Sequence, residues 1–435
     1  MIQAHLSTTR RWLKKTCWGI LLLIIVALGG LALSNLLLPS RSMIVDRLSD
    51  LDKARVAEAF HLRGGHGNNL WEGWGIAEIP LILYNEEYAF LAGCSNPSPG
   101  WTTVPQKVRH GGAWEIVPGD LLDGKHYYRQ RLPDKGATPQ AFTVRVGESW
   151  VASMTTQDWT AIAMGNEIRD AFPSLLRPFV PYRLAARIFL GLAMDTDGYI
   201  CAIGHESFHA FQGIVASVRI ENGENALARE GKRYPWNDRL FNEGWKAELN
   251  LLADALLTKD DKHMIELGQK FIALRKARRL SFNLDTNLVD LERLREWEEG
   301  LAKYTELALW KCASAVPDNG VVPVLGRDPD FKQYKGFPQR WTQEIITLRM
   351  QSGAGEIRFY YSGMAQGFML DRLLPGWRSR ILRDNLFLED LLSEAVGAGR
   401  ALIACPWRIA ILTDSADHRA VPMRRITLAE SSGWQ

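Results

Sequence analysis

Two histidines four residues apart carry the clearest chemical signal in this sequence. His205 and His209 lie within residues 203–210, and Glu206 directly follows the first of them. Side chains at positions i and i+4 share one face of a helix, so both imidazoles could bind one tetrahedral Zn²⁺ ion. Glu206 would lie beside the open coordination position, where its carboxylate could take a proton from an attacking water. The spacing therefore predicts a zinc site with hydrolytic chemistry.

A catalytic zinc site of this kind needs a third protein ligand, and a glutamate carboxylate is a common choice. Glu230 lies in a polar, loop-like stretch and is a weak candidate. Glu243 opens a helical pattern and is followed by glycine. Glu299 begins the sequence E-G-L-A-K-Y-T-E. We favour Glu299 as the third ligand and keep Glu243 as the alternative.

The motif HExxH with a downstream E-G-x-A-x-Y-x-E resembles the gluzincin branch of zinc peptidases, which includes the aminopeptidase N-like enzymes. The resemblance implies that Glu299 is the third zinc ligand. It also implies that Gly300 and Ala302 let this helix pack closely on the HExxH helix. Glu299 follows His209 at a far longer gap than is usual in that branch, and the Glu243-Gly pair stands nearer to the usual gap. The exopeptidase element G-A-M-E-N is missing, so the type of peptidase stays open.

A late aromatic cluster at residues 357–363 offers a further catalytic group. The phenol of Tyr360 or Tyr361 could donate a hydrogen bond to the oxyanion of a tetrahedral intermediate, and we name Tyr361 as the candidate. The alternative is an aromatic helix start that packs into the core. Cys201, one turn before the first histidine, is predicted to be a small buried core residue and not a ligand.

The elements that must position these residues fall into a strand-rich stretch and a helical one. After a short helix predicted at 41–62, Gly and Pro separate short runs rich in β-branched and aromatic residues up to residue 156. The clearest of these runs are 81–84, 88–91, 127–132, 142–146 and 149–154. Helical patterns follow, and the histidine pair falls in 199–218 and Glu299 in 288–309. This order predicts an α+β fold with a helical, zincin-like catalytic region.

An apolar segment near the N-terminus predicts where the rest of the chain lies. Residues 18–38 carry no charge and follow the basic residues Arg10, Arg11, Lys14 and Lys15. This pattern predicts a transmembrane anchor, a cytoplasmic N-terminus and a catalytic region on the periplasmic or extracellular side. A cleaved signal peptide is the main alternative. The predicted organisation is an N-terminus and anchor at 1–40, a strand-rich region at 41–156, a zinc-binding helical region at 157–415 and a tail at 416–435.

Composition narrows the classes of function. The chain has 435 residues and a net charge of +3, with no basic stripe that would indicate a nucleic-acid partner. Five cysteines without a CxxC pair provide neither a zinc ribbon nor a disulfide framework. The sequence therefore predicts a membrane-anchored zinc metallohydrolase that acts on peptide or protein substrates. A non-catalytic, membrane-tethered binding or scaffold protein with a structural zinc site is the alternative, and a zinc hydrolase of other amides or esters stays open.

Overall fold

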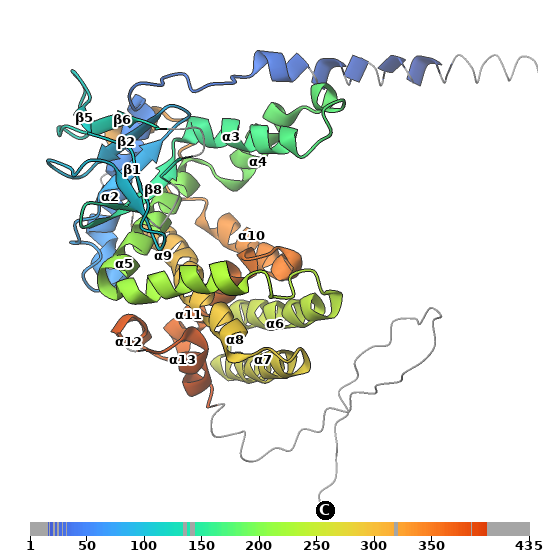
Figure 1. Cartoon of the computed structure of the whole chain (residues 1–435). Coiled ribbons are helices and arrows are strands. Elements are labelled where there is room, and N and C mark those ends of the chain that lie inside the picture. Colours follow the sequence, from blue (N-terminus) through green and yellow to red (C-terminus); the bar gives the residue numbers. More distant parts are fainter. Residues whose placement is uncertain are drawn as a thin grey trace, which may run out of the picture. The chain divides into compact units, whose positions relative to one another are not determined.

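The computed structural model describes residues 33–133, 137–139, 144–316, 321–383 and 385–397, with scattered positions between 16 and 31. One compact unit ends at Ala398, and the remainder, residues 399–435, lies outside the described part of the chain. The tail predicted at 416–435 therefore lies outside it as well. Figure 1 shows the order of the elements, from the strands near the N-terminus to the helices that follow.

Eight strands form one sheet in the order β4-β3-β7-β8-β1-β2-β6-β5. Strands β1 and β8 pair in parallel, with Leu81 opposite Ala152, and the other neighbours pair antiparallel. The predicted runs coincide with β1, β2, β6, β7 and β8, although residues 142 and 143 lie outside the described part. The strands are β1 (Leu81–Tyr84), β2 (Tyr88–Ala92), β3 (Trp101–Thr103), β4 (Arg109–His110), β5 (Glu115–Ile116), β6 (Tyr128–Arg131), β7 (Val144–Val146) and β8 (Ser149–Thr155).

Helices make up most of the remaining described structure, so the predicted α+β class is confirmed. The first helix of the compact body, α2, continues to Leu70 instead of ending near residue 62. The helix α10 was not predicted. The helices are α2 (Asp50–Leu70), α3 (Gln157–Asp170), α4 (Tyr182–Ala193), α5 (Thr196–Glu230), α6 (Arg239–Leu257), α7 (Asp261–Ser281), α8 (Thr286–Arg295), α9 (Leu301–Ala315), α10 (Phe337–Met350), α11 (Ile357–Leu373), α12 (Trp377–Arg383) and α13 (Leu388–Ala395). Short turns are η1 (Arg177–Phe179), η2 (Glu296–Gly300), η3 (Pro323–Arg327) and η4 (Gln351–Gly353).

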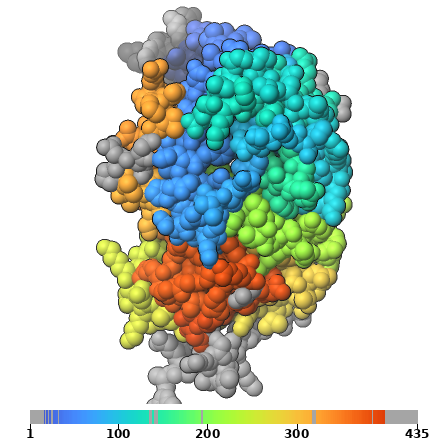
Figure 2. Space-filling view, turned by 90° about the vertical axis from the view of Figure 1, so that its left-hand side faces the viewer, coloured from blue at the N-terminus to red at the C-terminus, as the bar shows by residue number. Residues whose placement is uncertain are grey.

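The sheet separates two hydrophobic clusters. Successive side chains of a strand point to opposite faces, so Leu81 and Leu83 face the large cluster beneath the helices, while Ile82 faces a smaller one. The large cluster includes Trp71 at the end of α2. Figure 2 shows α2, in blue, on the face between the strand region in cyan and the C-terminal helices in orange-red. The sheet and α2 therefore support the helices that carry the histidines and Glu299.

Helix α5 carries both histidines and packs against strand β8 and helix α9. Its first turn is capped by Asp195, whose side chain accepts a hydrogen bond from the Gly198 amide at 3.0 Å. A Cβ at Gly213 would lie 2.3 Å from the ring of Trp150, so only glycine permits this contact with the sheet. Close packing on both sides fixes the rotation of α5 about its axis and therefore the direction of the histidines.

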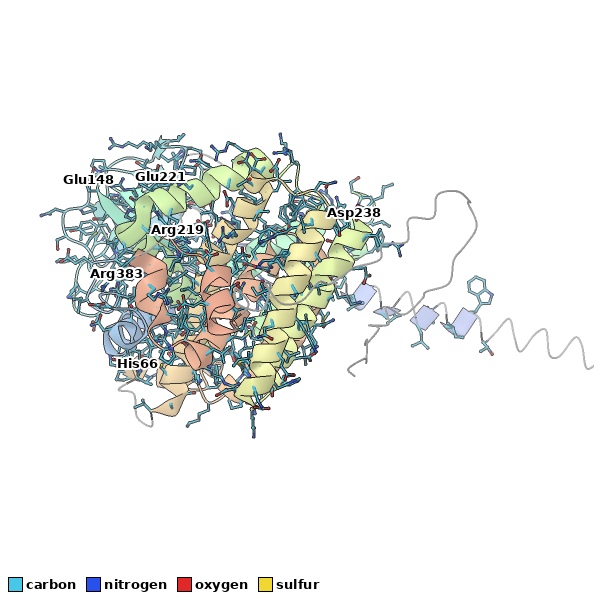
Figure 3. The ribbon with its side chains drawn as sticks, turned by 90° about the horizontal axis from the view of Figure 1, so that it is seen from below. His66, Glu148, Arg219, Glu221, Asp238 and Arg383 are labelled. Carbon is cyan, nitrogen blue, oxygen red and sulfur yellow. The ribbon has the colours of Figure 1, made fainter. Side chains whose placement is uncertain are left out.

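Glu299 lies in a π-helical turn, η2, between helices α8 and α9. The next residue, Gly300, packs against Gly363 of α11, where a Cβ at Gly300 would lie 2.4 Å from the Gly363 Cα atom. The resemblance implies that Gly300 and Ala302 let this helix pack on the HExxH helix; α9 does pack on α5, but Gly300 itself makes its close contact with α11. The guanidinium of Arg219, a residue of α5 labelled in Figure 3, lies 4.4 Å from the ring centroid of Trp297 in η2, which ties the turn to α5.

The predicted membrane topology requires a correction. A bilayer crossing needs about 20 consecutive apolar residues. Helices α2 and α7 are each 21 residues long, but charged residues interrupt both of them. Within the part of the chain that the structure describes, no helix combines sufficient length with sufficient apolar character to cross a membrane. The predicted single-pass topology, with an anchor at 18–38 and a periplasmic or extracellular catalytic region, is therefore wrong; part of 18–38 lies outside the described residues.

Candidate metal centre

Three side chains from two distant segments meet at one point. The Nε2 atoms of His205 and His209 lie 3.1 Å apart. The Glu299 Oε2 atom lies 3.3 Å from the His209 Nε2 atom and 3.7 Å from the His205 Nε2 atom. Ligands of a tetrahedral Zn²⁺ ion at about 2.1 Å are separated from each other by about 3.4 Å. The triangle of ligand atoms therefore has the size that a zinc ion requires, and all three residues are buried.

Gln212, one turn after His209, fixes the proton on that imidazole. The Gln212 Nε2 atom donates to the backbone carbonyls of Trp297 at 2.9 Å and Glu298 at 3.3 Å, so the amide oxygen must face the other way. That oxygen lies 3.0 Å from the His209 Nδ1 atom and can only accept a hydrogen bond. The Nδ1 atom therefore carries the proton, and the Nε2 lone pair points to the other two ligand atoms.

A carboxylate faces the outer nitrogen of the first histidine. The Glu306 Oε2 atom lies 3.4 Å from the His205 Nδ1 atom. The other oxygen of Glu306 accepts a hydrogen bond from the Lys303 ammonium at 2.7 Å, which keeps the carboxylate charged and in place. A carboxylate beside Nδ1 favours a proton on that atom and a free lone pair on Nε2. Sequence reasoning gave no role to Glu306 or Gln212.

Arg295 orients the third ligand. Its Nη2 atom donates to the Glu299 Oε1 atom at 2.6 Å, while Oε2 accepts no hydrogen bond from any described residue. Nη1 of the same guanidinium donates to Glu224 and Glu298, each at 2.7 Å. One oxygen of Glu299 is thus held by an arginine, and the other points at the two imidazoles. Two imidazole lone pairs and a carboxylate oxygen converge, an arrangement that a bound cation would stabilise.

Burial and charged neighbours shift the pKa values of all three residues. Burial opposes the ionisation of Glu299, but Arg295 and the two imidazoles outweigh it and hold the pKa of this carboxyl well below its usual range. Burial lowers the pKa of His209. Burial acts in the same direction on His205, but Glu299 and Glu306 outweigh it and raise the pKa of His205 to about 10. A metal ion that binds here would therefore have to displace a proton from His205.

The structure places the predicted general base and the two tyrosines in different surroundings. Glu206 is half-buried. The burial of Tyr84, at the end of β1, and the negative charge of Glu206 raise the pKa of the Tyr84 phenol. The ring of Tyr360 stacks on His205, with 6.0 Å between the ring centroids. Tyr361, which the sequence favoured, lies with its ring 5.9 Å from the Lys303 ammonium. The structure thus brings Tyr360, and not Tyr361, against a metal-ligand candidate.

The alternative ligands lie elsewhere. Glu243 is exposed on α6, where it lines a hollow with Arg239 and Lys246. Glu230, at the end of α5, pairs with Arg233. Cys201 is fully buried and is a free thiol outside the three-residue group. Among the described residues, the structure therefore brings Glu299 to the histidine pair and leaves the other candidates apart from it.

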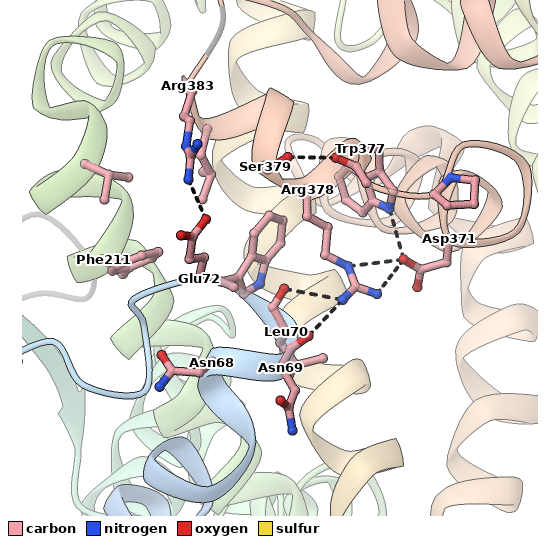
Figure 4. Close-up of a pocket in the computed structure, with 15 residues that line it drawn as sticks. Asn68, Asn69, Leu70, Glu72, Phe211, Asp371, Trp377, Arg378, Ser379 and Arg383 are labelled. Carbon is pink, nitrogen blue, oxygen red and sulfur yellow. Dashed lines mark hydrogen bonds and ion pairs between the residues drawn. The ribbon is translucent and has the colours of Figure 1, made fainter.

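A cavity of about 680 Å³ lies between the end of α2, helix α5 and helix α12 (Figure 4). Trp71 and Phe211 line it, and an ion pair between Glu72 and Arg383 lies beside it. Its described lining does not include the three metal-ligand candidates. The ring of Trp71 packs on Phe208 of the histidine helix, with 4.8 Å between the ring centroids. The cavity therefore adjoins the helix that carries the site but is separate from the metal centre.

No family model, curated protein or solved structure matches this chain. Functional inference therefore rests on the geometry of the centre formed by His205, His209 and Glu299.

Proposed function

We propose that this protein is a zinc hydrolase that cleaves peptide bonds, with zinc held by His205, His209 and Glu299. The observation that carries the proposal is the convergence of three buried ligand atoms, each oriented by a partner of its own. Two imidazoles and one carboxylate are the protein ligands of many catalytic zinc sites, whereas structural sites are normally closed by four. In the described part of the chain the group has three members, which favours a catalytic over a structural site.

A bound zinc ion would polarise the scissile carbonyl and make a water molecule acidic at neutral pH. Glu206 would accept the proton of the attacking water and pass it to the leaving amine. Burial and the charge of Glu299 raise the pKa of Tyr360 well above its usual range, so this phenol stays protonated. Tyr360 would therefore donate a hydrogen bond to the oxyanion of the tetrahedral intermediate. The resemblance of the motifs to gluzincins favours a peptide over other amides as substrate.

Metal content and hydrolysis test this proposal together. We expect protein purified without chelators to hold one zinc ion per chain, and Glu299→Gln to lose it. Glu206→Gln should keep the zinc and lose about 10²–10⁴-fold in kcat on a mixture of unrelated peptides, because a general base contributes that much. Glu243→Gln is the matched control and should change neither readout. Metal-free wild-type protein, or full activity in Glu206→Gln, would overturn the proposal.

A further inference from the structure

The helical hairpin of α3 and α4 exposes many large apolar side chains. The two helices contact each other, and a connection that contains η1 joins them (Figure 1). Leu175 is 85% exposed and Phe179 is 58% exposed. We define the apolar tip as Phe172, Leu175, Leu176, Phe179, Ile188 and Phe189, all of which are exposed. Large apolar side chains exposed in this number on one short hairpin favour a surface that a partner covers.

The charged residues of the connection and of α4 are all basic. Residues 171–193 contain Arg177, Arg183 and Arg187 and no acidic residue. Asp170, just outside this range, pairs with Arg177 at 3.3 Å, and Arg187 is exposed directly beside Ile188. A symmetric contact with a second copy of the chain would bring these like charges together. The charge therefore favours a partner with an anionic surface.

A second exposed apolar segment is attached to the same hairpin, where the connection enters α4. The Asn35 Nδ2 atom donates to the Val180 carbonyl at 2.6 Å, and the Arg183 Nη1 atom donates to the Leu38 carbonyl at 2.8 Å. Leu36 and Leu37, between these contacts, are 81% and 76% exposed. Apolar side chains from two distant segments are thus exposed next to each other, which extends the surface beyond the hairpin.

We propose that the apolar tip docks on an anionic lipid surface. Its apolar side chains would enter the boundary between headgroups and acyl chains, and Arg177 and Arg187 would lie among the anionic headgroups. Fluid lipid can surround side chains that project in several directions, whereas a folded protein partner would need a matching hollow. The contact is interfacial and requires no helix that crosses the bilayer. It is also independent of the metal centre.

Binding of the full-length chain to vesicles tests this proposal. We expect affinity for vesicles of phosphatidylcholine with phosphatidylserine to exceed that for phosphatidylcholine alone by about tenfold, because each arginine gains from the anionic surface. Leu175→Asp with Phe179→Asp should lower the affinity by at least about tenfold, since both side chains lose apolar burial. Ile346→Asp with Met350→Asp is the matched control, because these exposed residues of α10 lie outside the hairpin.

Amide hydrogen exchange gives a local readout that residual binding by other apolar segments does not obscure. Anionic vesicles should slow exchange in residues 171–190 and leave residues 337–357 unchanged, and the Leu175→Asp/Phe179→Asp variant should lose this protection. Unchanged exchange in residues 171–190 of vesicle-bound protein would overturn the proposal. Protection that appears without vesicles and grows with protein concentration would also overturn it, since a second copy would then be the partner.

Discussion

At the scale of single residues, a different neighbouring side chain orients each metal-ligand candidate. Gln212 faces His209, Glu306 faces His205, and Arg295 holds Glu299. Partners of this kind set the tautomer and orientation of a ligand, and their loss typically costs 10–100-fold in metal affinity. The three ligands would therefore be preorganised before a metal binds.

Replacement of Gln212 by leucine tests this preorganisation. The variant removes the acceptor for the His209 Nδ1 proton at similar volume, so we expect zinc affinity to fall by about 10–100-fold. Competition with a chromophoric chelator measures the dissociation constant. Gln269→Leu is the control, because Gln269 also donates to a backbone carbonyl, that of Val396, but lies on α7. An equal effect of both substitutions would contradict the role of Gln212.

The two tyrosines give a second test at this scale. Tyr360→Phe removes the hydroxyl of the ring that stacks on His205, and we expect kcat to fall by about 10²–10³-fold, the usual cost of an oxyanion donor. Tyr361→Phe should leave kcat nearly unchanged, because its ring lies against Lys303. Steady-state kinetics on the same peptide distinguish them, and the reverse ranking would restore the expectation drawn from the sequence.

The sequence predicts which residue types could form the site more readily than it predicts the direction in which their side chains point. His205, His209 and Glu299 stand in motifs whose spacing or resemblance suggests a ligand, and the structure brings them together. Tyr360 and Tyr361 differ by about 100° around a helix axis, and that phase depends on how α11 packs. Arg295 and Gln212 belong to no motif. Arg295 donates to Glu299, 4 residues later, and the Gln212 amide donates to the backbone carbonyl of Trp297, 85 residues away.

At the scale of elements, the contact between η2 and α11 decides where Glu299 lies. Gly300 and Gly363 let the two backbones approach so closely that a Cβ on either glycine would meet backbone atoms of the other segment. A helix that must move away at this point would also move the preceding residue, Glu299. Glycine here is therefore a condition for the metal centre and not only for packing.

Gly300→Ala tests this dependence. We expect a loss of about 1–3 kcal/mol or more in unfolding free energy, because an added methyl overpacks the contact, together with weaker zinc binding. Gly65→Ala is the matched control, since nothing lies within 4 Å of a Cβ at this helical glycine. That substitution should stabilise the protein by about 0.5–1 kcal/mol. Urea unfolding measures the stability of both variants. Equal stabilisation by Gly300→Ala and Gly65→Ala would contradict the close contact between Gly300 and Gly363.

The strands and the main helices follow from local patterns, whereas η2 does not. Short apolar and aromatic runs bounded by turn residues predict β1 at its observed bounds and β2 to within one residue. The pattern at 288–309 predicted one continuous helix, yet the structure contains a π-helical turn at Glu296–Gly300. The packing of Gly300 on Gly363 and the burial of five consecutive residues favour this turn, and both are tertiary effects.

At the scale of the whole molecule, a buried ionic network connects the helices around the metal centre. Arg275 and Arg278 of α7 bind Glu248 of α6. Arg278 also binds Glu292 of α8, and Arg275 reaches Glu296 in η2. These charges are almost fully buried, so loss of one partner leaves an uncompensated charge in the core. The network therefore links the stability of the helical region to pH.

The sign of this pH dependence follows from Glu292. Burial opposes its ionisation, but Arg278 and Arg279 outweigh it and hold the pKa of Glu292 well below its usual range. A lowered carboxyl pKa stabilises the fold above the unfolded value of about 4.3, and this stability is lost as pH falls below it. The urea concentration at the unfolding midpoint should therefore decrease as the pH is lowered from 6 to 3.

Glu292→Gln checks the assignment of this effect. The variant should lose about 3–5 kcal/mol at pH 7, because its arginines are left without a partner, and its stability should vary less with pH. Glu394→Gln is the control, since Glu394 forms an exposed pair with Arg380. An unchanged pH dependence in Glu292→Gln would assign the acid sensitivity to other carboxyls.

The π-helical turn has a consequence for how this chain can change in length. A π turn holds one residue more than the α-helical turn it replaces, so α8 and α9 differ in phase across Glu296–Gly300. Because of this offset, the continuous helical segment of α8, η2 and α9 directs Glu296 toward Arg275 of α7 and Glu299 toward the two imidazoles. A single-residue deletion within the turn would restore regular winding and rotate one of these carboxylates away. Insertions and deletions that surface loops accept should therefore be rejected here, even where the new sequence is an excellent helix former.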